Sequence, residues 1–440
     1  MLRRSWLVLF PWLLLCAQAK FEYWPGAIYD PVIPAQRKIL GYDAGEHISS
    51  HAQIVRYMEA LAAACPNRMK LWDYGKTWEG RRLIYAAIGS EANIKRLGEI
   101  RDNIHKLADP RRTSDADAKR IQGSLPAVVW LAYGVHGNEV SSSDAALMLA
   151  YHLLASRNDK KVDAILENTV VMINPVQNPD GRDRFVFNYD LNGGLEPDAN
   201  PISAEHSEVW PGGRTNHYFF DLNRDWLAIT QPESRGNIEV LKEWLPQVYV
   251  DLHEMGTDGT YYFAPDANPI NPHLTQAQQD NQSWFGKANA RLFDQLGFSY
   301  FTREMYDAFY PGYTASWPAY YGAISMTYEN GSTRGLIVKK ADDTFVTYRE
   351  TVRRHFLTTL ETCDVAGQHR AELLEEFWRY RKSAIEEGST EPVREYILVR
   401  RGDVSTVDKL AQLMLEHGAE VKRAADTSRR TGGKFRREVT

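Results

Sequence analysis

A histidine and a glutamate stand three residues apart, at His136 and Glu139, directly after an apolar run at residues 127–132. That run is short and rich in β-branched and aromatic residues, which is typical of a buried strand, and residues 140–154 have the pattern of a helix. The pair therefore lies where a strand ends and a helix begins, at the rim of an open α/β sheet where ligands bind. Imidazole nitrogen and carboxylate oxygen are both ordinary ligands of Zn²⁺.

A third ligand is offered far downstream by His253, which follows a second strand-like run at residues 248–252. Two strands that end in histidine, one of them also followed by a glutamate, would bring three ligands together at one edge of a sheet. A single histidine in such a place is more often a hydrogen-bonding loop residue, but the three residues together favour a metal site. Three protein ligands leave a fourth position open for water, which is typical of catalytic rather than structural zinc.

From about residue 45 to about residue 365, the sequence is similar to the zinc carboxypeptidases of the pancreatic carboxypeptidase A type. The matching pieces, in chain order, are Gly-Lys-Thr-Trp-Glu-Gly-Arg at 75–81, His-Gly-Asn-Glu at 136–139, Asn-Pro-Asp-Gly at 178–181, Asp-Leu-Asn-Arg at 221–224 and Asp-Leu-His at 251–253. Each piece is weak alone, but five of them in the family's order make a specific signal. The resemblance implies one Zn²⁺ per chain, held by the two histidines and the glutamate, and a peptide substrate.

The same resemblance implies a general base and an anchor for the substrate. Glu329, in a strand-like segment that ends in a polar turn, is expected to take the proton of the attacking water and pass it to the leaving amine. Asn223 and Arg224 are expected to bind the free C-terminal carboxylate, because a planar guanidinium forms paired charge-assisted hydrogen bonds with it.

A cation is also needed beside the oxyanion that forms during attack. Arg214 stands shortly before the anchor motif, as the family's polarising arginine does, and Arg182 and Arg184 compete with it for that role. The chain also departs from the family, because some members carry an arginine between the first two zinc ligands where this chain has Asn138.

A tyrosine that closes over bound substrate is expected at Tyr310, with Tyr313 and Tyr306 as alternatives. Ala315, close by, would leave an apolar pocket for the side chain of the released residue. The long polar stretch at residues 188–217 is rich in Gly and Pro and has no periodic pattern, so we expect a loop that shapes the mouth of the cleft.

The N-terminus has the pattern of a signal peptide. Met-Leu-Arg-Arg is followed by about ten apolar residues, too few for a permanent membrane span, and then by a small-x-small cleavage site, Ala-Gln-Ala, at residues 17–19. We therefore expect residues 1–19 to be removed and the protein to be exported to the periplasm or the extracellular space. The remaining cysteines, Cys65 and Cys363, are too few for a disulfide scaffold, and the sequence leaves open whether they pair.

Composition sets the outer limits of fold and partners. A chain of 440 residues with 43% hydrophobic content can bury a large core, and a formal net charge of −5 favours neither nucleic acid nor an anionic membrane as a partner. Strand and helix patterns alternate, which predicts a mixed, largely parallel twisted sheet with helices on both faces. The expected divisions are a lead-in segment at 20–45, a catalytic domain at 46–384, and a linker with an incomplete, small C-terminal βα segment at 385–440.

Three functions are compatible with these residues. The first is an exported zinc carboxypeptidase that acts on peptides with a free C-terminal carboxylate, cell-wall peptides included. The second is an N-acyl amino acid deacylase of the aspartoacylase or succinylglutamate desuccinylase type, which resembles the pieces at 136–139 and 221–224. The third is a non-catalytic peptide-binding protein on the same fold. The Asn-Pro-Asp-Gly segment and the placement of Glu329 favour the peptidase, and the sequence does not indicate an oligomeric state.

Overall fold

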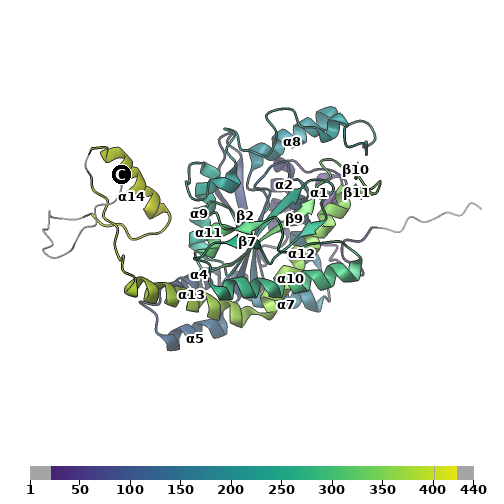
Figure 1. Ribbon diagram of the computed structural model, residues 1–440. Helices are drawn as coiled ribbons and strands as arrows, with labels where there is room; N and C mark the ends of the chain where they lie inside the picture. The colour runs from purple at the N-terminus through teal and green to yellow at the C-terminus, as the bar shows by residue number, and fades with distance from the viewer. Residues whose placement is uncertain (1–20, 401, 424–440) are drawn as a thin grey trace, which may run out of the picture.

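A twisted sheet forms the centre of the molecule (Figure 1). The computed structural model describes residues 21–400 and 402–423, so the expected signal peptide and most of the C-terminal tail lie outside the described residues. The sheet has the strand order β1-β2-β4-β3-β5-β9-β6. In that order the strands are Met69–Lys76, Arg82–Ile88, Thr169–Asn174, Ala127–Tyr133, Val248–Met255, Ile324–Gly331 and Tyr261–Tyr262. The four central strands, β4, β3, β5 and β9, run parallel, and the outer pairs are antiparallel. The expected mixed, largely parallel sheet is confirmed.

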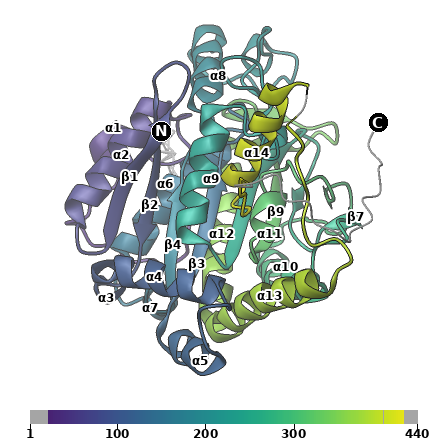
Figure 2. The same cartoon turned by 90° about the vertical axis from the view of Figure 1, so that its left-hand side faces the viewer.

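Helices cover both faces of this sheet, as the sequence predicted. On one face lie α2 (His51–Ala64), α6 (Ser141–Ala155), α7 (Lys160–Asn168), α10 (Gln276–Leu296) and α12 (Tyr348–Gln368), whose buried side chains share one core cluster. On the other face lie α3 (Glu91–Lys95), α4 (Leu97–Ala108), α5 (Asp115–Ser124), α9 (Pro232–Trp244) and α13 (Arg370–Thr390). Two views at right angles show this three-layer arrangement (Figures 1 and 2).

Strand β3 supplies both cores because side chains alternate along a strand. Val129 and Leu131 point into the first core, whereas Val128 and Trp130 point into the second. All four are buried. Since each such side chain contributes about 1.5–3 kcal/mol when fully buried, the strand before the His136 turn is held firmly from both sides.

The elements expected around the metal-ligating residues are confirmed to within one or two residues. Helix α6 begins at Ser141 and not at residue 140, and α2 begins after Ser50, whose side chain accepts a hydrogen bond from the backbone N–H of Gln53. Gln53 in turn accepts from the backbone of Ser50, which completes a capping box.

Two expectations about irregular segments are wrong. Helix α8 (Pro179–Asn192) extends into the stretch expected to be a loop, and the true loop begins after it. The expected linker at residues 386–391 is mostly helical, because α13 continues to Thr390. The C-terminal turns of α8 and α13 are polar, so their sequence has no periodic apolar pattern. The apolar residues that pack these two helices lie nearer their N-termini.

The expected C-terminal βα segment is only half formed. Residues 396–399 form no strand, and Tyr396 is 87% exposed, because no neighbouring strand in the described part of the chain supplies a ladder partner. The helix is present as α14 (Val404–Glu416), beside α9 (Figure 2). There the Lys242 ammonium donates to the Glu416 carbonyl over 2.7 Å.

The remaining elements are short and lie around the edges of the sheet. They are α1 (Gln36–Leu40), α11 (Ser316–Ala319), β7 (Ala267–Ile270), β8 (Asp307–Ala308), β10 (Ile337–Lys339), β11 (Phe345–Thr347) and the 3₁₀ turns η1 (Ala204–His206) and η2 (Leu222–Arg224). Cys65 and Cys363 are buried free thiols and do not pair. Among the described residues, no helix has both the length and the apolar content that a bilayer span requires.

Candidate metal centre

His136, Glu139 and His253 meet at the carboxyl ends of β3 and β5. One ligand atom from each lies within 4.8 Å of the others, and all three side chains are buried. Glu139 lies between the two imidazoles, with Oε1 2.7 Å from Nδ1 of His136 and Oε2 3.0 Å from Nδ1 of His253. The structure therefore brings His253 to a pair of residues that lies more than a hundred positions earlier in the sequence.

The turn that carries the first two ligands depends on glycine. The backbone of α8 passes so close to Gly137 that an added Cβ would lie 2.1 Å from the amide nitrogen of Arg182. Any larger residue at this position would push the turn away from α8. The close approach fixes His136 and Glu139 relative to the rest of the sheet edge.

Two aspartates orient the imidazoles. Nε2 of His136 lies 3.0 Å from Oδ1 of Asp221, and Nε2 of His253 lies 2.6 Å from Oδ2 of Asp251. With those nitrogens occupied, the Nδ1 atoms of both rings face Glu139. A carboxylate on the far nitrogen is the usual companion of a metal-binding histidine, and two histidines with one carboxylate suit Zn²⁺. The residues present therefore fit the ion that the sequence predicted.

Both aspartates lie within the matched sequence motifs, but neither was expected to support a ligand. A signal was present for Asp251, because residues two apart on a strand point to the same side, so the carboxylate had to lie beside His253. No comparable signal existed for Asp221, since it reaches His136 from a loop 85 residues away.

The charges within the cluster stabilise one another. Burial opposes ionisation of Glu139, but the two imidazoles hold the pKa of its carboxyl far below the ordinary value. For His253, burial favours the neutral ring, yet Asp251 and Glu139 raise its pKa well above the ordinary value. This apposition of buried anions and imidazoles is the electrostatic environment that a divalent cation requires.

Glu329 lies beside this cluster. It is paired in register with His253 on the neighbouring parallel strand, β9, and it is buried. Burial raises the pKa of its carboxyl to about 8; the nearby Glu139 carboxylate adds to this effect, and His253 counteracts it. The position expected for the base is therefore next to the ligands and protected from bulk water.

The three competing arginines have different surroundings. Arg182 is buried and forms an ion pair of 2.8 Å with Asp144, and Arg184 donates to the carbonyls of Gly212 and Asn216. Only Arg214 reaches the cluster: its Nη1 lies 3.6 Å from Oε1 of Glu139, and its Nη2 lies 2.9 Å from the carboxylate of Asp221. Geometry thus leaves Arg214 as the cation beside the candidate metal.

Asn223 and Arg224 lie in η2, directly after Asp221. Oδ1 of Asn223 accepts from the backbone and the side chain of Thr314, both over 2.9 Å, and its Nδ2 group is turned toward His253, 3.5 Å from Nε2. Thr314 also bonds to Asp251. This chain of contacts connects the expected anchor of the substrate to a ligand of the metal.

The Arg224 guanidinium is exposed and stacks over the ring of Tyr313 at 4.7 Å. Tyr310 donates from its hydroxyl to the Arg224 carbonyl over 3.2 Å and remains 37% exposed. Both tyrosines therefore adjoin the anchor. Tyr306 packs instead against Tyr262, with ring centroids 4.8 Å apart.

A cavity of about 150 Å³ lies beside β9, where Ser325 and Thr327 line it. Ala315, expected near the pocket for the released residue, is among the residues that line this cavity. Polar side chains share the lining, among them Asp266, Gln282 and Thr327. Burial raises the pKa of the Asp266 carboxyl to about 6, and Gln282 donates to it over 2.6 Å. Asp266 was missed because it stands 13 residues beyond His253 in an irregular segment without a motif.

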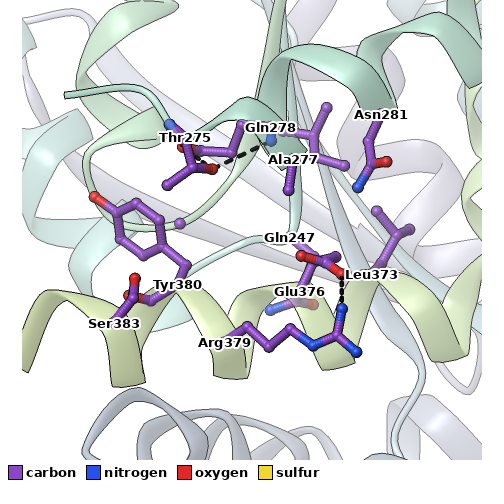
Figure 3. Close-up of a pocket in the computed structure, with 12 residues that line it drawn as sticks. Gln247, Thr275, Ala277, Gln278, Asn281, Leu373, Glu376, Arg379, Tyr380 and Ser383 are labelled. Atoms are coloured by element: carbon purple, nitrogen blue, oxygen red, sulfur yellow. Dashed lines mark hydrogen bonds and ion pairs between the residues drawn. The ribbon is translucent and has the colours of Figure 1, made fainter. Parts of the chain in front are cut away.

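A second cavity, of about 170 Å³, lies between α10 and α13 (Figure 3). Gln247 and Ile324, at the starts of β5 and β9, line it, so it opens at the amino edge of the sheet. At about 3.3 Å per strand residue, this edge is roughly 20 Å from the histidine ligands. The cavity is therefore not part of the metal centre.

Residues 54–244 match the family of zinc carboxypeptidases. Mouse (Mus musculus) carboxypeptidase Z is 25% identical over 185 residues, and carboxypeptidase 2 of Trichophyton rubrum is 30% identical over 145 residues. These matches cover 41% and 32% of this chain, and the chain spans 22% of the length of either relative. These findings support a relationship between residues 54–244 and the zinc carboxypeptidase family.

Solved structures of carboxypeptidases align with this chain at low sequence identity. A metallo-carboxypeptidase from Burkholderia cenocepacia aligns with a TM-score of 0.46 and 16% identity over 73% of this chain and 68% of that one. Carboxypeptidase A from Helicoverpa armigera aligns with a TM-score of 0.48 and 16% identity over 77% of this chain and 80% of that one.

Proposed function

We propose that this protein is a zinc-dependent carboxypeptidase that releases the C-terminal residue of peptides. The observation that carries the proposal is the side-by-side placement of a His-Glu-His ligand set, a buried carboxyl at Glu329 and an exposed arginine at Arg224. Zn²⁺ is proposed as the single ion bound by His136, Glu139 and His253. When bound, it supplies a Lewis acid that polarises the peptide carbonyl and acidifies water.

Glu329 acts as the general base. A cation beside its carboxyl lowers the pKa, because positive charge favours the ionised form, so the group can accept the proton of the attacking water at neutral pH. The same carboxyl then delivers the proton to the amine of the leaving residue. Arg214, across the cluster, stabilises the negative charge that develops on the carbonyl oxygen.

Arg224 and Asn223 bind the free carboxylate of the substrate. The guanidinium offers two parallel N–H donors, and the Nδ2 group of Asn223 adds another. Tyr310 is the residue proposed to close over the bound substrate. The polar cavity with Asp266 and Ala315 receives the side chain of the released residue.

We also propose that the protein acts outside the cytoplasm, after removal of residues 1–19. The support for this is the basic, apolar and small-residue pattern of its N-terminus. Residues 46–384 form the proposed catalytic domain.

The test is a comparison of two peptides that differ only at the C-terminus. Zinc-loaded protein should release the last residue from a peptide with a free carboxylate and leave the amidated twin intact. The Glu329→Gln variant should bind zinc normally and lose at least about a hundredfold in kcat, the lower range for removal of a general base. Equal cleavage of both peptides would contradict anchoring at Arg224.

The two other functions give different results in the same assay. Hydrolysis of small N-acyl amino acids, with peptides left intact, would favour the deacylase. Zinc binding and peptide binding without any hydrolysis by the wild type would favour the binding protein.

A further inference from the structure

A loop at residues 214–221, here called the rim loop, begins and ends at the metal centre. At its start, a guanidinium nitrogen of Arg214 lies 3.3 Å from Nδ1 of His136. At its end, Asp221 holds Nε2 of the same imidazole. Whatever the rim loop displays is therefore fixed in position relative to the reacting bond.

The base of the rim loop is buried and polar. Asn216 is fully buried, and its Oδ1 accepts from the backbone N–H groups of Tyr218 and Phe220, both over 3.1 Å. Its Nδ2 group donates to Gln231 over 2.8 Å. One buried side chain thus holds the chain reversal in place.

The tip of the rim loop carries three consecutive aromatic residues. Tyr218, Phe219 and Phe220 are 55%, 51% and 45% exposed. Phe219 has φ +66°, a left-handed backbone conformation that is rare for a bulky residue and is found most often where function requires it. Neither the solubility of the protein nor the packing of the loop requires three large exposed rings on a fixed base. A cluster of this kind typically marks a binding surface.

Two neighbouring indoles extend this aromatic surface. Trp78 packs edge-to-face against Tyr218 at 5.1 Å, and Trp210 packs against Phe219 at 5.3 Å. Trp78 and Trp210 are themselves more than half exposed. The tip and the two indoles form a continuous apolar surface beside the cleft.

The sheet order fixes the side of the metal centre on which this surface lies. The cavity for the released residue is lined by β9, on one side of the ligand-bearing strands β3 and β5. Trp78 lies in the turn between β1 and β2, on the other side. That turn is at the same sheet edge, since Thr77 bonds to Asp180 at the start of α8 over 2.7 Å.

A bound peptide must cross the metal centre in one direction. Its last residue lies in the β9 cavity and its scissile carbonyl lies at the metal, so the preceding residues run toward β2 and β1. We propose that the tip of the rim loop, with Trp78 and Trp210, binds apolar or aromatic side chains of the substrate upstream of the bond that is cut. This inference rests on the proposed function and adds a substrate class, peptides with large apolar residues before the C-terminal pair.

The test compares three substrates with the same last two residues: an N-acylated dipeptide, a hexapeptide with Phe and Leu upstream, and a hexapeptide with Ser and Gly upstream. For the wild type, kcat/KM should be at least about tenfold higher for the apolar hexapeptide than for the polar one, the effect of one well-packed aromatic contact. The double variant Tyr218→Ser, Phe219→Asn should abolish this ratio. Asn tolerates the left-handed backbone at position 219, so the fold of the loop is kept.

A matched control is Phe345→Ser, which removes an aromatic side chain 57% exposed on the separate sheet of β10 and β11. It should leave the ratio at the wild-type value. Binding of both hexapeptides to zinc-loaded Glu329→Gln protein, followed by tryptophan fluorescence, gives a readout that needs no turnover.

Equal affinities and equal kcat/KM for the two hexapeptides would overturn the inference while leaving the carboxypeptidase intact. So would a preference that survives in the double variant. If no peptide is hydrolysed, the proposed function fails, and the fluorescence titration still decides whether this surface binds apolar peptide.

Discussion

At the scale of single residues, the least expected finding is the pair of aspartates behind the histidine ligands. Asp251 does two things: it holds Nε2 of His253, and it bonds to Thr314, which also binds Asn223. One carboxylate thereby orients both a candidate metal ligand and Asn223 of the proposed substrate anchor.

Replacement of Asp251 by Asn should therefore weaken zinc binding about 10–100-fold, the usual effect of losing such a partner, because an amide stabilises the required imidazole orientation less well than a carboxylate. Competition with a chromogenic chelator measures the affinity. Asp343→Asn, a change at an exposed carboxylate, is the control and should leave the affinity unchanged. Zinc affinity equal to wild type in Asp251→Asn would show that Asp251 only packs.

Much of the candidate site was predictable from the sequence, because its histidines stand near the ends of apolar runs whose burial fixes where each strand ends. His136 and His253 are of this kind, and Glu329 follows the same rule on β9. Asp266 and Thr314 were not predictable. They reach the site from irregular segments whose course depends on long-range packing and leaves no periodic trace in the sequence.

At the scale of elements, the correct predictions are again those that rest on an apolar pattern in the sequence, and the incorrect ones concern segments without such a pattern or without a partner. Strands and helices with an apolar face were placed to within a few residues, as for β3 and α6. The prediction of a C-terminal strand at residues 396–399 is wrong although these residues favour β-structure, because a strand forms only with a partner strand that completes its hydrogen-bond ladder. Whether a partner strand is available depends on the whole fold and not on the sequence of the segment itself.

Glu233, in the first turn of helix α9, is expected to make the stability of the fold depend on pH. This carboxyl is buried, and its Oε2 accepts from Asn216 over 3.3 Å while its Oε1 has no hydrogen-bond partner among the described residues. Burial raises its pKa to about 7. The folded protein thus holds this proton more tightly than the unfolded chain does, and stability falls as pH rises from about 4.5 to about 7.

The Glu233→Gln variant removes this ionisation and keeps an oxygen for Asn216. It should be more stable than wild type by about 3 kcal/mol at pH 8, and by much less at pH 5, where the wild-type carboxyl is still protonated. Urea unfolding at the two pH values measures the difference. A stability difference that is the same at both would indicate that Glu233 is ionised throughout.

At the scale of the whole molecule, the metal centre connects parts of the chain that are distant in sequence. Its ligands come from the turn after β3 and from β5, and its supporting carboxylates come from β5 and from the rim loop. An ion bound at this site would therefore crosslink the middle of the sheet to the rim loop. Ions that bind the folded state alone stabilise it in proportion to the logarithm of their concentration.

Removal of zinc should thus lower the thermal midpoint of the entire domain and not only loosen the cleft. At free zinc a thousandfold above Kd, the ion contributes about 4 kcal/mol of stability, so the chelated protein should unfold several degrees lower, in a single transition. Differential scanning calorimetry with and without chelator measures this, and the Glu139→Gln variant is the control, because the loss of a ligand should make its midpoint insensitive to zinc. A midpoint that chelation leaves unchanged in the wild type would mean that His136, Glu139 and His253 do not converge on one ion.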